Sequence, residues 1–541
     1  MIHCLLVFLV GVAMADSPTP SETTQPARCV VDAQDYLDPS LADCGLQKAI
    51  DVAAAKGGGV VQLPAVRVKL ERYLYLHSDV TVKGRGGDTV LTLGKDETRF
   101  DIAADIPSGA SEIPLAEAPE GLRPGMLVFL WPDDSAYHEG RVPYARVVAI
   151  DGRKIVIDKP TGEDMSKDRK PWVSWGLHTY LTKPADKGDR KITVAQGDLL
   201  SPGYAVWMKG RGDMWGHHLN VVVSVDGNIA TLERPLTIDA EAESLVQHGF
   251  AMFTADGEKH IGISDLVIEG WGQKRQPRWV GMDFCLGGLH TVRCDDVTVS
   301  NVEIRKWHSD GVSIQKAQGA TVNNSSVIDC RGRGFHPGTT SDSIEFRNVR
   351  AEGNGLDGFY YCWNLTNVNL RDSVIKGNDG HGIGGLGDPG DRRATIENNV
   401  IEGNGLSGID INGGGENSGT VIRNNIIRNN SRLKAGEWPG IAVFPTGEPA
   451  KGYLIEGNTI ASTLEKPTQL VGIEERNGDP IRAEVRTGRR RTVARIADGN
   501  IIRNNKYSGH AKADVIAVGP GTEVSEEEGV KILRQTVKGT E

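Results

Sequence analysis

Ionisable side chains recur at two fixed positions beside a series of regularly spaced glycines. The glycines are Gly311, Gly334, Gly358, Gly382, Gly408, Gly440 and Gly472. The position directly before the glycine and the position two residues after it carry Asp310, Arg333, Asp357, His381, His336, Tyr360 and Asp410. Histidine, tyrosine and aspartate are side chains that transfer protons in enzymes, and arginine pairs with carboxylates. The pattern therefore predicts general acid–base chemistry on one face of a repeated structure.

Two reactions fit these residue types. On a polysaccharide that contains uronic acids, Arg333 would neutralise the carboxylate, and His336 and Tyr360 would remove one proton and deliver another. The outcome would be β-elimination, or C5 epimerisation if the glycosidic bond survives. The alternative is an inverting glycoside hydrolase, whose two carboxyls lie roughly 6.5–9.5 Å apart. Asp310 and Asp357 lie two repeats apart, about 9.6 Å at the spacing of parallel strands.

The favoured hypothesis is a lyase or C5-epimerase, and the alternative is the hydrolase. A third class is a non-catalytic carbohydrate-binding or tailspike-like surface protein. The expected catalytic residues are His336, Tyr360, Arg333, Asp357, His381 and Asp310. The expected substrate-binding residues are His308, Trp307, Arg331, Asp410 and Trp363. Asp310, Asp357 and His381 also fit simple turn positions, because each stands next to a glycine.

The glycines belong to a ladder of imperfect repeats that must position these side chains. The repeat length grows from 23 residues, Gly311 to Gly334, to 32 residues, Gly440 to Gly472. Short runs rich in Val and Ile lie between Gly, Asn and Asp, which is typical of strands stacked as a solenoid. The residue after each glycine is apolar and should point inward: Val312, Phe335, Phe359, Ile383, Ile409, Ile441 and Ile473. Alternation then sends the ionisable positions outward.

The N-terminal part of the ladder carries a family resemblance. The stretch DCGLQKAIDVAAAKGGGVVQLPA, followed by YLYLHSDVTVKGRGGDTVLTL, joins an amphipathic helix, a glycine triplet and two strand signals. In this order they resemble the cap and first coils of the pectate-lyase-like superfamily. The resemblance covers about residues 40–95 and 256–510. It implies an all-β, right-handed parallel β-helix with an N-terminal capping helix. The interruption of the ladder at residues 96–250 predicts an inserted small β domain. The superfamily contains lyases, hydrolases, epimerases and tailspikes, so it implies no single reaction.

The chain divides into five predicted parts. Residues 1–15 read as a signal peptide, since LLVFLVGV precedes Ala13-Met14-Ala15. Residues 16–95 hold a leader, the cap and the first coils, and residues 251–515 hold the β-helix. Residues 96–250 contain a duplication, in which RPGMLVFLWPDDS resembles SPGYAVWMKGRGD. Residues 516–541 form a C-terminal cap or tail, for which Ser525 to Glu528 predict a short helix.

The composition limits the classes of molecule that the protein is expected to bind. A net charge of −10 over 541 residues argues against nucleic-acid binding. No stretch is long and apolar enough for a membrane span. We therefore expect a secreted or periplasmic monomer that acts on a polysaccharide, requires no cofactor or metal, and leaves Ca²⁺ as an option. Cys29 and Cys44 could pair in an oxidising compartment. Cys285, Cys294, Cys330 and Cys362 are expected as buried or half-buried thiols.

Overall fold

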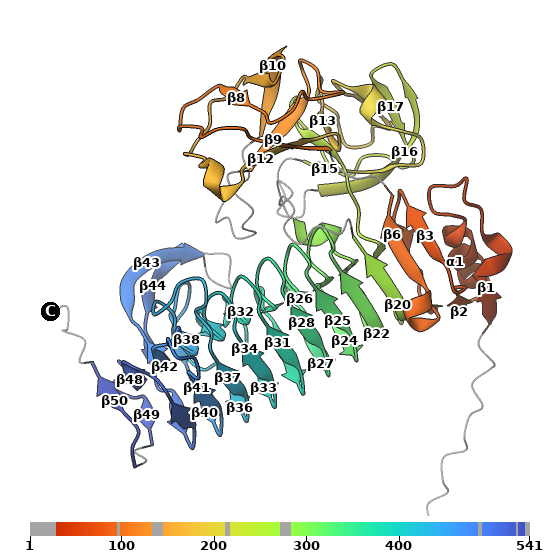
Figure 1. Cartoon of the computed structure of the whole chain (residues 1–541). Helices are drawn as coiled ribbons and strands as arrows, with labels where there is room; N and C mark the ends of the chain where they lie inside the picture. The colour runs from red at the N-terminus through yellow and green to blue at the C-terminus, as the bar shows by residue number, and fades with distance from the viewer. Residues whose placement is uncertain are drawn as a thin grey trace, which may run out of the picture.

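A computed structural model of the chain describes residues 29–94, 98–131, 144–210, 217–270, 283–484, 490–525 and 528–535. The predicted signal peptide, residues 1–15, and the first part of the leader, residues 16–28, lie outside the described residues. Figure 1 shows an elongated array of stacked coils with a compact insertion against one side. Among the described residues, no helix has the length and apolar character that crossing a membrane requires.

Two parallel sheets run along the coils, and each coil contributes strands to both. The twelve-stranded sheet consists of β4 (Leu74–Tyr75), β19 (Phe253–Asp256), β21 (Leu289–Val292), β23 (Val312–Gln315), β26 (Phe335–Gly338), β29 (Phe359–Tyr360), β32 (Ile383–Leu386), β35 (Ile409–Ile411), β38 (Ile441–Val443), β42 (Val471–Glu475), β48 (Ala513–Ala517) and β50 (Ile532–Arg534). Because neighbouring strands come from successive repeats, the predicted parallel β-helix is confirmed.

The second sheet has 22 strands, since most coils add two short strands to it. They are β1 (Val30–Asp32), β2 (Gly59–Gln62), β3 (Arg67–Leu70), β5 (Val80–Lys83), β6 (Val90–Leu93), β20 (Gly262–Glu269), β22 (Asp295–Arg305), β24 (Gln318–Asn323), β25 (Ser326–Ile328), β27 (Asp342–Arg347), β28 (Arg350–Glu352), β30 (Thr366–Arg371), β31 (Val374–Lys376), β33 (Thr395–Glu397), β34 (Val400–Glu402), β36 (Val421–Arg423), β37 (Ile426–Arg428), β40 (Leu454–Glu456), β41 (Thr459–Ala461), β46 (Ile501–Arg503), β47 (Lys506–Ser508) and β49 (Glu523–Val524).

The interior of the coils is the apolar column that the repeats predict. Val312 pairs with Phe335, which pairs with Phe359, which pairs with Ile383. These side chains, and Ile409 in the next coil, are at most 1% exposed. Burial of each large apolar side chain contributes about 1.5–3 kcal/mol, so this column is a main source of stability. The predicted register is therefore correct.

A column of asparagines closes the turns between the two sheets. The side-chain amide of Asn354 donates to Asn378, Asn378 donates to Asn404, and Asn404 donates to Asn430, at 2.9 to 3.0 Å. Each amide also donates to a strand carbonyl, as Asn404 does to Ile375. All four side chains are buried, so the ladder satisfies polar groups that solvent does not reach.

Helix α1 (Leu46–Ala55) covers the N-terminal end of the coils. Leu46, Ala49, Ile50 and Ala53 form its buried face, as the amphipathic pattern predicts. The helix begins at Leu46, after Gly45 in a left-handed conformation, and Asp43 caps the turn by accepting from the Gly45 N–H. Short 3-10 turns lie at η1 (Ala33–Tyr36), η2 (Gly86–Asp88), η3 (Lys167–Arg169), η4 (Gly197–Leu199) and η5 (Asp283–Leu286).

The insertion contains two six-stranded antiparallel sheets with the same strand order. The first is β7 (Thr98–Asp101), β12 (Trp172–Trp175), β9 (Leu127–Trp131), β10 (Tyr144–Asp151), β11 (Lys154–Ile157) and β8 (Glu112–Pro114). The second is β13 (His178–Tyr180), β18 (Leu245–His248), β15 (Ala205–Lys209), β16 (His217–Asp226), β17 (Ile229–Leu232) and β14 (Lys191–Thr193). The internal duplication seen in the sequence is thus a duplication of structure.

At the C-terminal end, strands β49 and β50 extend the two parallel sheets. The helix predicted from Ser525 to Glu528 would begin on Glu526 and Glu527, which lie outside the described residues, and residues 528–535 contain no helix. Strands β43 (Gly478–Glu484) and β44 (Arg490–Arg495) form an antiparallel pair, and β39 (Ala450–Lys451) pairs with β45 (Ala497–Asp498). Among the described residues, the six cysteines are all free, so Cys29 and Cys44 are not paired.

Candidate functional site

The outward positions of the twelve-stranded sheet bring the predicted residues together. Ser313 pairs with His336 between β23 and β26, and Tyr360 pairs with Gly384 between β29 and β32. The turns before these strands supply Asp310, Arg333, Asp357 and His381. We call the set Asp310, Arg333, His336, Asp357, Tyr360, His381, Asp388 and Asp410 the ionisable face. Most of its members are nearly buried: His336 is 2% exposed and Asp388 is 9% exposed.

Asp310 and His336 form a buried ion pair. The Nδ1 atom of His336 lies 2.7 Å from Oδ2 of Asp310, and the Arg333 backbone N–H donates to Oδ1 of the same carboxylate. Burial alone would raise the pKa of Asp310, but the hydrogen bond from His336 and the charge of Arg333 bring it below its ordinary value. Burial lowers the pKa of His336, but Asp310 outweighs it and raises that pKa. Asp310 therefore favours the charged form of the imidazole, which donates protons.

Arg333 and Tyr360 stack on each other in the centre of the face. The guanidinium carbon of Arg333 lies 4.0 Å from the centroid of the Tyr360 ring. The guanidinium of Arg333 also lies 3.9 Å from an oxygen of Asp310 and 3.7 Å from an oxygen of Asp357. It therefore forms ion pairs with two carboxylates. Burial raises the pKa of Tyr360 well above its ordinary value. The phenol therefore keeps its proton and can donate a hydrogen bond.

Asp388 joins this face from the turn after β32, and the sequence patterns did not single it out. The Tyr360 hydroxyl donates to Oδ2 of Asp388 at 3.3 Å, and the Asn412 amide donates to Oδ1 at 3.2 Å. Burial raises the pKa of Asp388 to about 6, against these two hydrogen bonds, and the charge of Asp410 adds to the increase. A carboxyl with such a pKa can hold a proton near neutral pH and release it during a reaction.

Two further carboxyls approach the same point around Gly384. A methyl group added at Gly384 would lie 2.8 to 3.0 Å from the carboxyl atoms of Asp357. Only a glycine leaves room there. Burial, strengthened by the charge of Asp357 and opposed by His381, raises the pKa of Asp410. Asp357, Asp388 and Asp410 therefore form an acidic group, in which the charge of Asp410 raises the pKa of Asp388 and the charge of Asp357 raises the pKa of Asp410.

His381 is a proton-transfer group at the accessible side of the face. It is partly exposed, its backbone N–H donates to Asp357, and its Nδ1 lies 2.6 Å from the Ser407 hydroxyl. Its Nε2 lies 3.9 Å from Asp410, and its ring meets Trp438 edge to face at 4.8 Å. The ring is thus held between a carboxylate and an aromatic side chain.

Three of the expected substrate-binding residues lie under the insertion. Trp307, His308 and Arg331 are 1 to 3% exposed. The Trp307 indole donates to the Leu286 carbonyl, and the Arg331 guanidinium faces the ring of Trp131, on β9, at 5.6 Å. Arg331 therefore contacts the insertion, Trp307 is bonded to η5, and none of the three side chains offers more than a small surface to a polymer. The sequence could not reveal this, because the contact joins segments that share no repeat.

Trp363 is another residue that the sequence predicts to bind the substrate. Trp363 is 40% exposed at the edge of the face, where an aromatic ring can stack on a sugar.

Within the described residues, no group of three or more His, Cys, Asp or Glu side chains is arranged to hold a metal ion. The expectation that no cofactor is required stays a prediction, as does the option of Ca²⁺.

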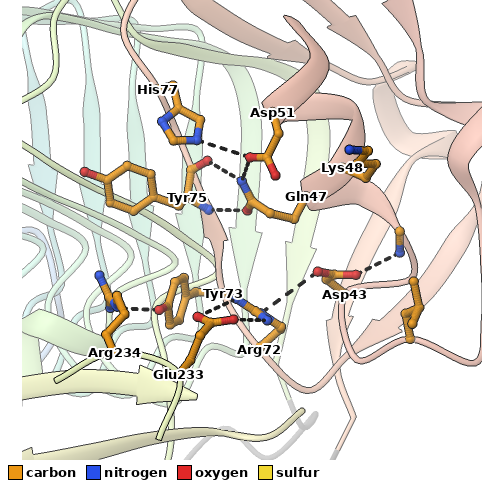
Figure 2. Close-up of a pocket in the computed structure, with 12 residues that line it drawn as sticks. Asp43, Gln47, Lys48, Asp51, Arg72, Tyr73, Tyr75, His77, Glu233 and Arg234 are labelled. Atoms are coloured by element: carbon orange, nitrogen blue, oxygen red, sulfur yellow. Dashed lines mark hydrogen bonds and ion pairs between the residues drawn. The ribbon is translucent and has the colours of Figure 1, made fainter. Parts of the chain in front are cut away.

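A separate cavity of about 440 Å³ lies where α1, the first coil and the insertion meet (Figure 2). Its polar side chains bond to one another: Arg72 donates to both carboxylate oxygens of Glu233, and Arg234 donates to the Tyr73 hydroxyl. The strand that passes it, β4, is four strands from β26 in the sheet order, about 19 Å at the spacing of parallel strands. The cavity therefore lies between the N-terminal cap and the insertion, and it is distant from the ionisable face.

Fold and site together define a right-handed parallel β-helix protein with an ionisable face. A family model described as "Right handed beta helix region" matches residues 287–460. No curated protein sequence matched the chain. The A-module of the mannuronan C-5 epimerase AlgE4 of Azotobacter vinelandii is similar in structure, with 16% identity, a TM-score of 0.47, and coverage of 92% of this chain and 100% of that one.

Two other solved structures are similar in the same way. DFA-IIIase from Arthrobacter chlorophenolicus A6 has 13% identity and a TM-score of 0.42, over 92% of this chain and 93% of that one. The tailspike gp61 of Pseudomonas phage phi297 has 13% identity and a TM-score of 0.36, over 91% and 73%. These resemblances concern the fold, so the function has to come from the site.

Proposed function

We propose that the chain is a carbohydrate-active enzyme that hydrolyses glycosidic bonds, with Asp388 as the general acid. The observation that carries the proposal is the buried carboxyl of Asp388, whose pKa is raised to about 6. An inverting glycosidase needs one carboxyl that keeps its proton and a second that stays ionised to activate water. Asp357, which lies 3.7 Å from Arg333, is the candidate for the second role. An extended row of coils suits an extended polysaccharide substrate.

We favour a hydrolase over a lyase because of the pKa shifts on the ionisable face. A lyase needs a base that removes the proton next to the uronate carboxylate. Asp310 raises the pKa of His336, which favours the charged imidazole, and burial raises the pKa of Tyr360, which favours the neutral phenol. Both shifts act against a role of these residues as the base. Under the hydrolase proposal, Tyr360 orients Asp388 through its hydroxyl, and Arg333 orients Tyr360 by stacking.

A uronan lyase or C5-epimerase is the second candidate, and the position of Arg333 favours it. Its guanidinium is the cation that could neutralise a substrate carboxylate, and it stands two coils before His381, the accessible imidazole. In this reaction His381 would take the proton and Tyr360 would supply one. The acidic group of Asp357, Asp388 and Asp410 disfavours an anionic polymer at this point, because its charges would repel the substrate.

A panel of neutral and uronate polysaccharides tests both candidates. Samples are assayed for new reducing ends, for the ultraviolet absorbance of unsaturated uronides, and for C5 inversion by proton NMR. Hydrolysis gives reducing ends without absorbance. Asp388→Asn should lose at least about 100-fold in rate, the usual contribution of a positioned acid. The matched control is Asp88→Asn, at an exposed carboxylate on η2. Full activity of Asp388→Asn would refute the hydrolase proposal, and binding without turnover would indicate a carbohydrate-binding protein.

The remaining expectations from the sequence become part of this proposal. The partner is a polysaccharide that lies along the twelve-stranded sheet. We propose that the protein is exported to the periplasm or the medium as a monomer that needs no cofactor. N-terminal sequencing of the exported protein, light scattering and assay after chelation measure these three properties. A retained N-terminus, a dimer or loss of activity with chelator would each overturn the corresponding part.

A further inference from the structure

The outward column of residues that carries the ionisable face continues beyond it toward the N-terminal cap. Pairing between the strands from β26 back to β4 links, in order, His336, Ser313, His290, Thr254 and Tyr75. Partners in neighbouring parallel strands point to the same side of a sheet. Tyr75 therefore stands on the same side of the coils as His336, about 19 Å away at the spacing of parallel strands.

A second cavity, of about 190 Å³, lies on this column between the coils and the insertion. The coils contribute Thr254 on β19 and His290 on β21 to its lining, and the second sheet of the insertion contributes Trp207 on β15. Tyr75 and Arg234 line both this cavity and the larger cavity of Figure 2. The two cavities are therefore neighbours along the column, and we call them together the N-terminal cavities.

Tyr75 is the aromatic side chain that stands between the two cavities. In Figure 2 it lies across the larger cavity from Lys48, which belongs to α1. Its backbone N–H donates to the Gln47 side chain at 2.7 Å, and its hydroxyl donates to a carboxylate oxygen of Glu258 at 3.1 Å. The side chain is nevertheless half-buried, so part of its surface is open to a ligand. A ring that is fixed before binding loses little conformational freedom when a sugar stacks on it.

Hydrogen-bonding side chains of the smaller cavity are also oriented in advance. Nδ1 of His218 lies 2.9 Å from the Thr237 hydroxyl, and its Nε2 lies 2.6 Å from the Asn220 amide nitrogen. Nδ1 of His290 lies 3.2 Å from the hydroxyl of Ser313, one strand nearer to the ionisable face. A concave site with an aromatic wall and a few fixed polar groups is suited to a ligand that carries many hydroxyls.

The charges that line the N-terminal cavities are balanced, which favours a neutral ligand. The larger cavity has as many cations as carboxylates: Lys48, Arg72, Arg234, Asp43, Asp51 and Glu233. Arg72 donates to both carboxylate oxygens of Glu233, and the smaller cavity combines Arg234 with Asp256. An anionic sugar would have to compete with carboxylates that already hold these cations. Sugar hydroxyls can instead join the hydrogen bonds around the ion pairs.

We propose that the N-terminal cavities are carbohydrate subsites that bind neutral sugar units of the polysaccharide, with the Tyr75 ring as the stacking surface and the second sheet of the insertion as the opposite wall. The inference rests on the proposed function for the identity of the polymer and the place of its cleavage. Thr254 lies three strands from His336, about 14 Å at the spacing of parallel strands. A chain that reaches both places is an oligosaccharide, so these subsites select long chains over short fragments.

The test measures binding by isothermal titration calorimetry with long and short cello-, manno- and fructo-oligosaccharides and with a long oligomannuronate as the anionic probe. All samples carry Asp388→Asn, which prevents turnover under the proposed hydrolysis. Tyr75→Ala should weaken binding of a long neutral oligosaccharide at least about 10-fold, because stacking contributes about 0.5–1.5 kcal/mol beyond the area it buries. Tyr75→Phe keeps the ring and should bind within about 3-fold of the parent, inside the 1.4 kcal/mol that a tenfold change represents.

Tyr507→Ala is the matched control, since Tyr507 is also half-buried but lies on β47 in the other sheet. It should leave binding unchanged. Equal affinity of Tyr75→Ala and its parent, an equal loss for short and long chains, or no binding of any neutral probe would overturn the proposal. Binding of the oligomannuronate alone would overturn the neutral class of ligand.

Hydroxyl-radical footprinting of the chain with its native Tyr75 keeps the proposal testable if Tyr75→Ala does not fold. A long neutral oligosaccharide at saturation should protect the Tyr75 peptide from oxidation and leave the Tyr507 peptide unprotected, as mass spectrometry measures. Unchanged oxidation of Tyr75 would refute the subsites. Binding that depends on Tyr75 without turnover by the unmodified protein would count against the hydrolase alone. Polymer turnover that Tyr75→Ala leaves unchanged, in a chain with native Asp388, would count against the subsites alone.

Discussion

Replacing Asp388 by asparagine should stabilise the protein near neutral pH while it removes activity. An asparagine side chain has the same shape and can accept from Asn412 with its oxygen, and its nitrogen can donate to the Tyr360 hydroxyl, which then accepts. The substitution therefore changes the charge of the buried group and reverses one hydrogen bond. Such a gain in stability is expected when a functional site holds a charged group in surroundings that disfavour the charge.

The magnitude follows from the pKa of Asp388, which is about 6 in the folded protein against an ordinary 3.8. The folded state binds the proton more tightly than the unfolded state, so stability falls as pH rises from about 4 to about 6. At about 1.4 kcal/mol per pH unit, ionisation of Asp388 costs about 3 kcal/mol above that window. The neutral amide of the variant carries no such cost, so Asp388→Asn should be up to about 3 kcal/mol more stable near pH 7 and about equal to the unmodified protein near pH 4.

Urea unfolding followed by circular dichroism measures this difference at several pH values. Asp88→Asn is the control, since an exposed carboxylate keeps its hydration on folding, and it should show no comparable gain. A variant that is less stable than the unmodified protein near pH 7, or a difference that stays constant down to pH 4, would refute the conclusion that Asp388 is a buried carboxyl with a raised pKa.

Three other outcomes are expected. Ile409→Ala should lower the free energy of unfolding by about 2–5 kcal/mol, because it leaves a cavity in the inward column, and a loss under about 1 kcal/mol in urea unfolding would contradict that packing. Asn404→Ala should cost about 3 kcal/mol, because it leaves donors of Asn378 unpaired in the buried ladder, while unchanged unfolding would show that the ladder is dispensable. Arg333→Ala should move the alkaline limb of the pH–activity profile upward, because the charge of Arg333 lowers the pKa of Asp388; movement to lower pH would contradict this.

The repeat itself determined the coil and its two sides. Parallel stacking puts residues one repeat apart next to each other, so a period in the sequence becomes a column in space. That is why Phe335, Phe359 and Ile383 could be assigned to the interior, and His336 and Tyr360 to the outer side, without any structure. The pleat of the strands leaves only these two sides, so a correct period implies a correct register.

Only the tertiary structure decided which outward residues are accessible and which charges they carry. Arg331 looked like a substrate-binding residue until the insertion was seen to cover it through Trp131. Asp388 stands outside the periodic positions, and its neighbours come from other coils. The physical reason is that the docking of an insertion and the path of a turn are set by long-range packing, which leaves no periodic trace in the sequence. The pKa values that separate a hydrolase from a lyase depend on that burial.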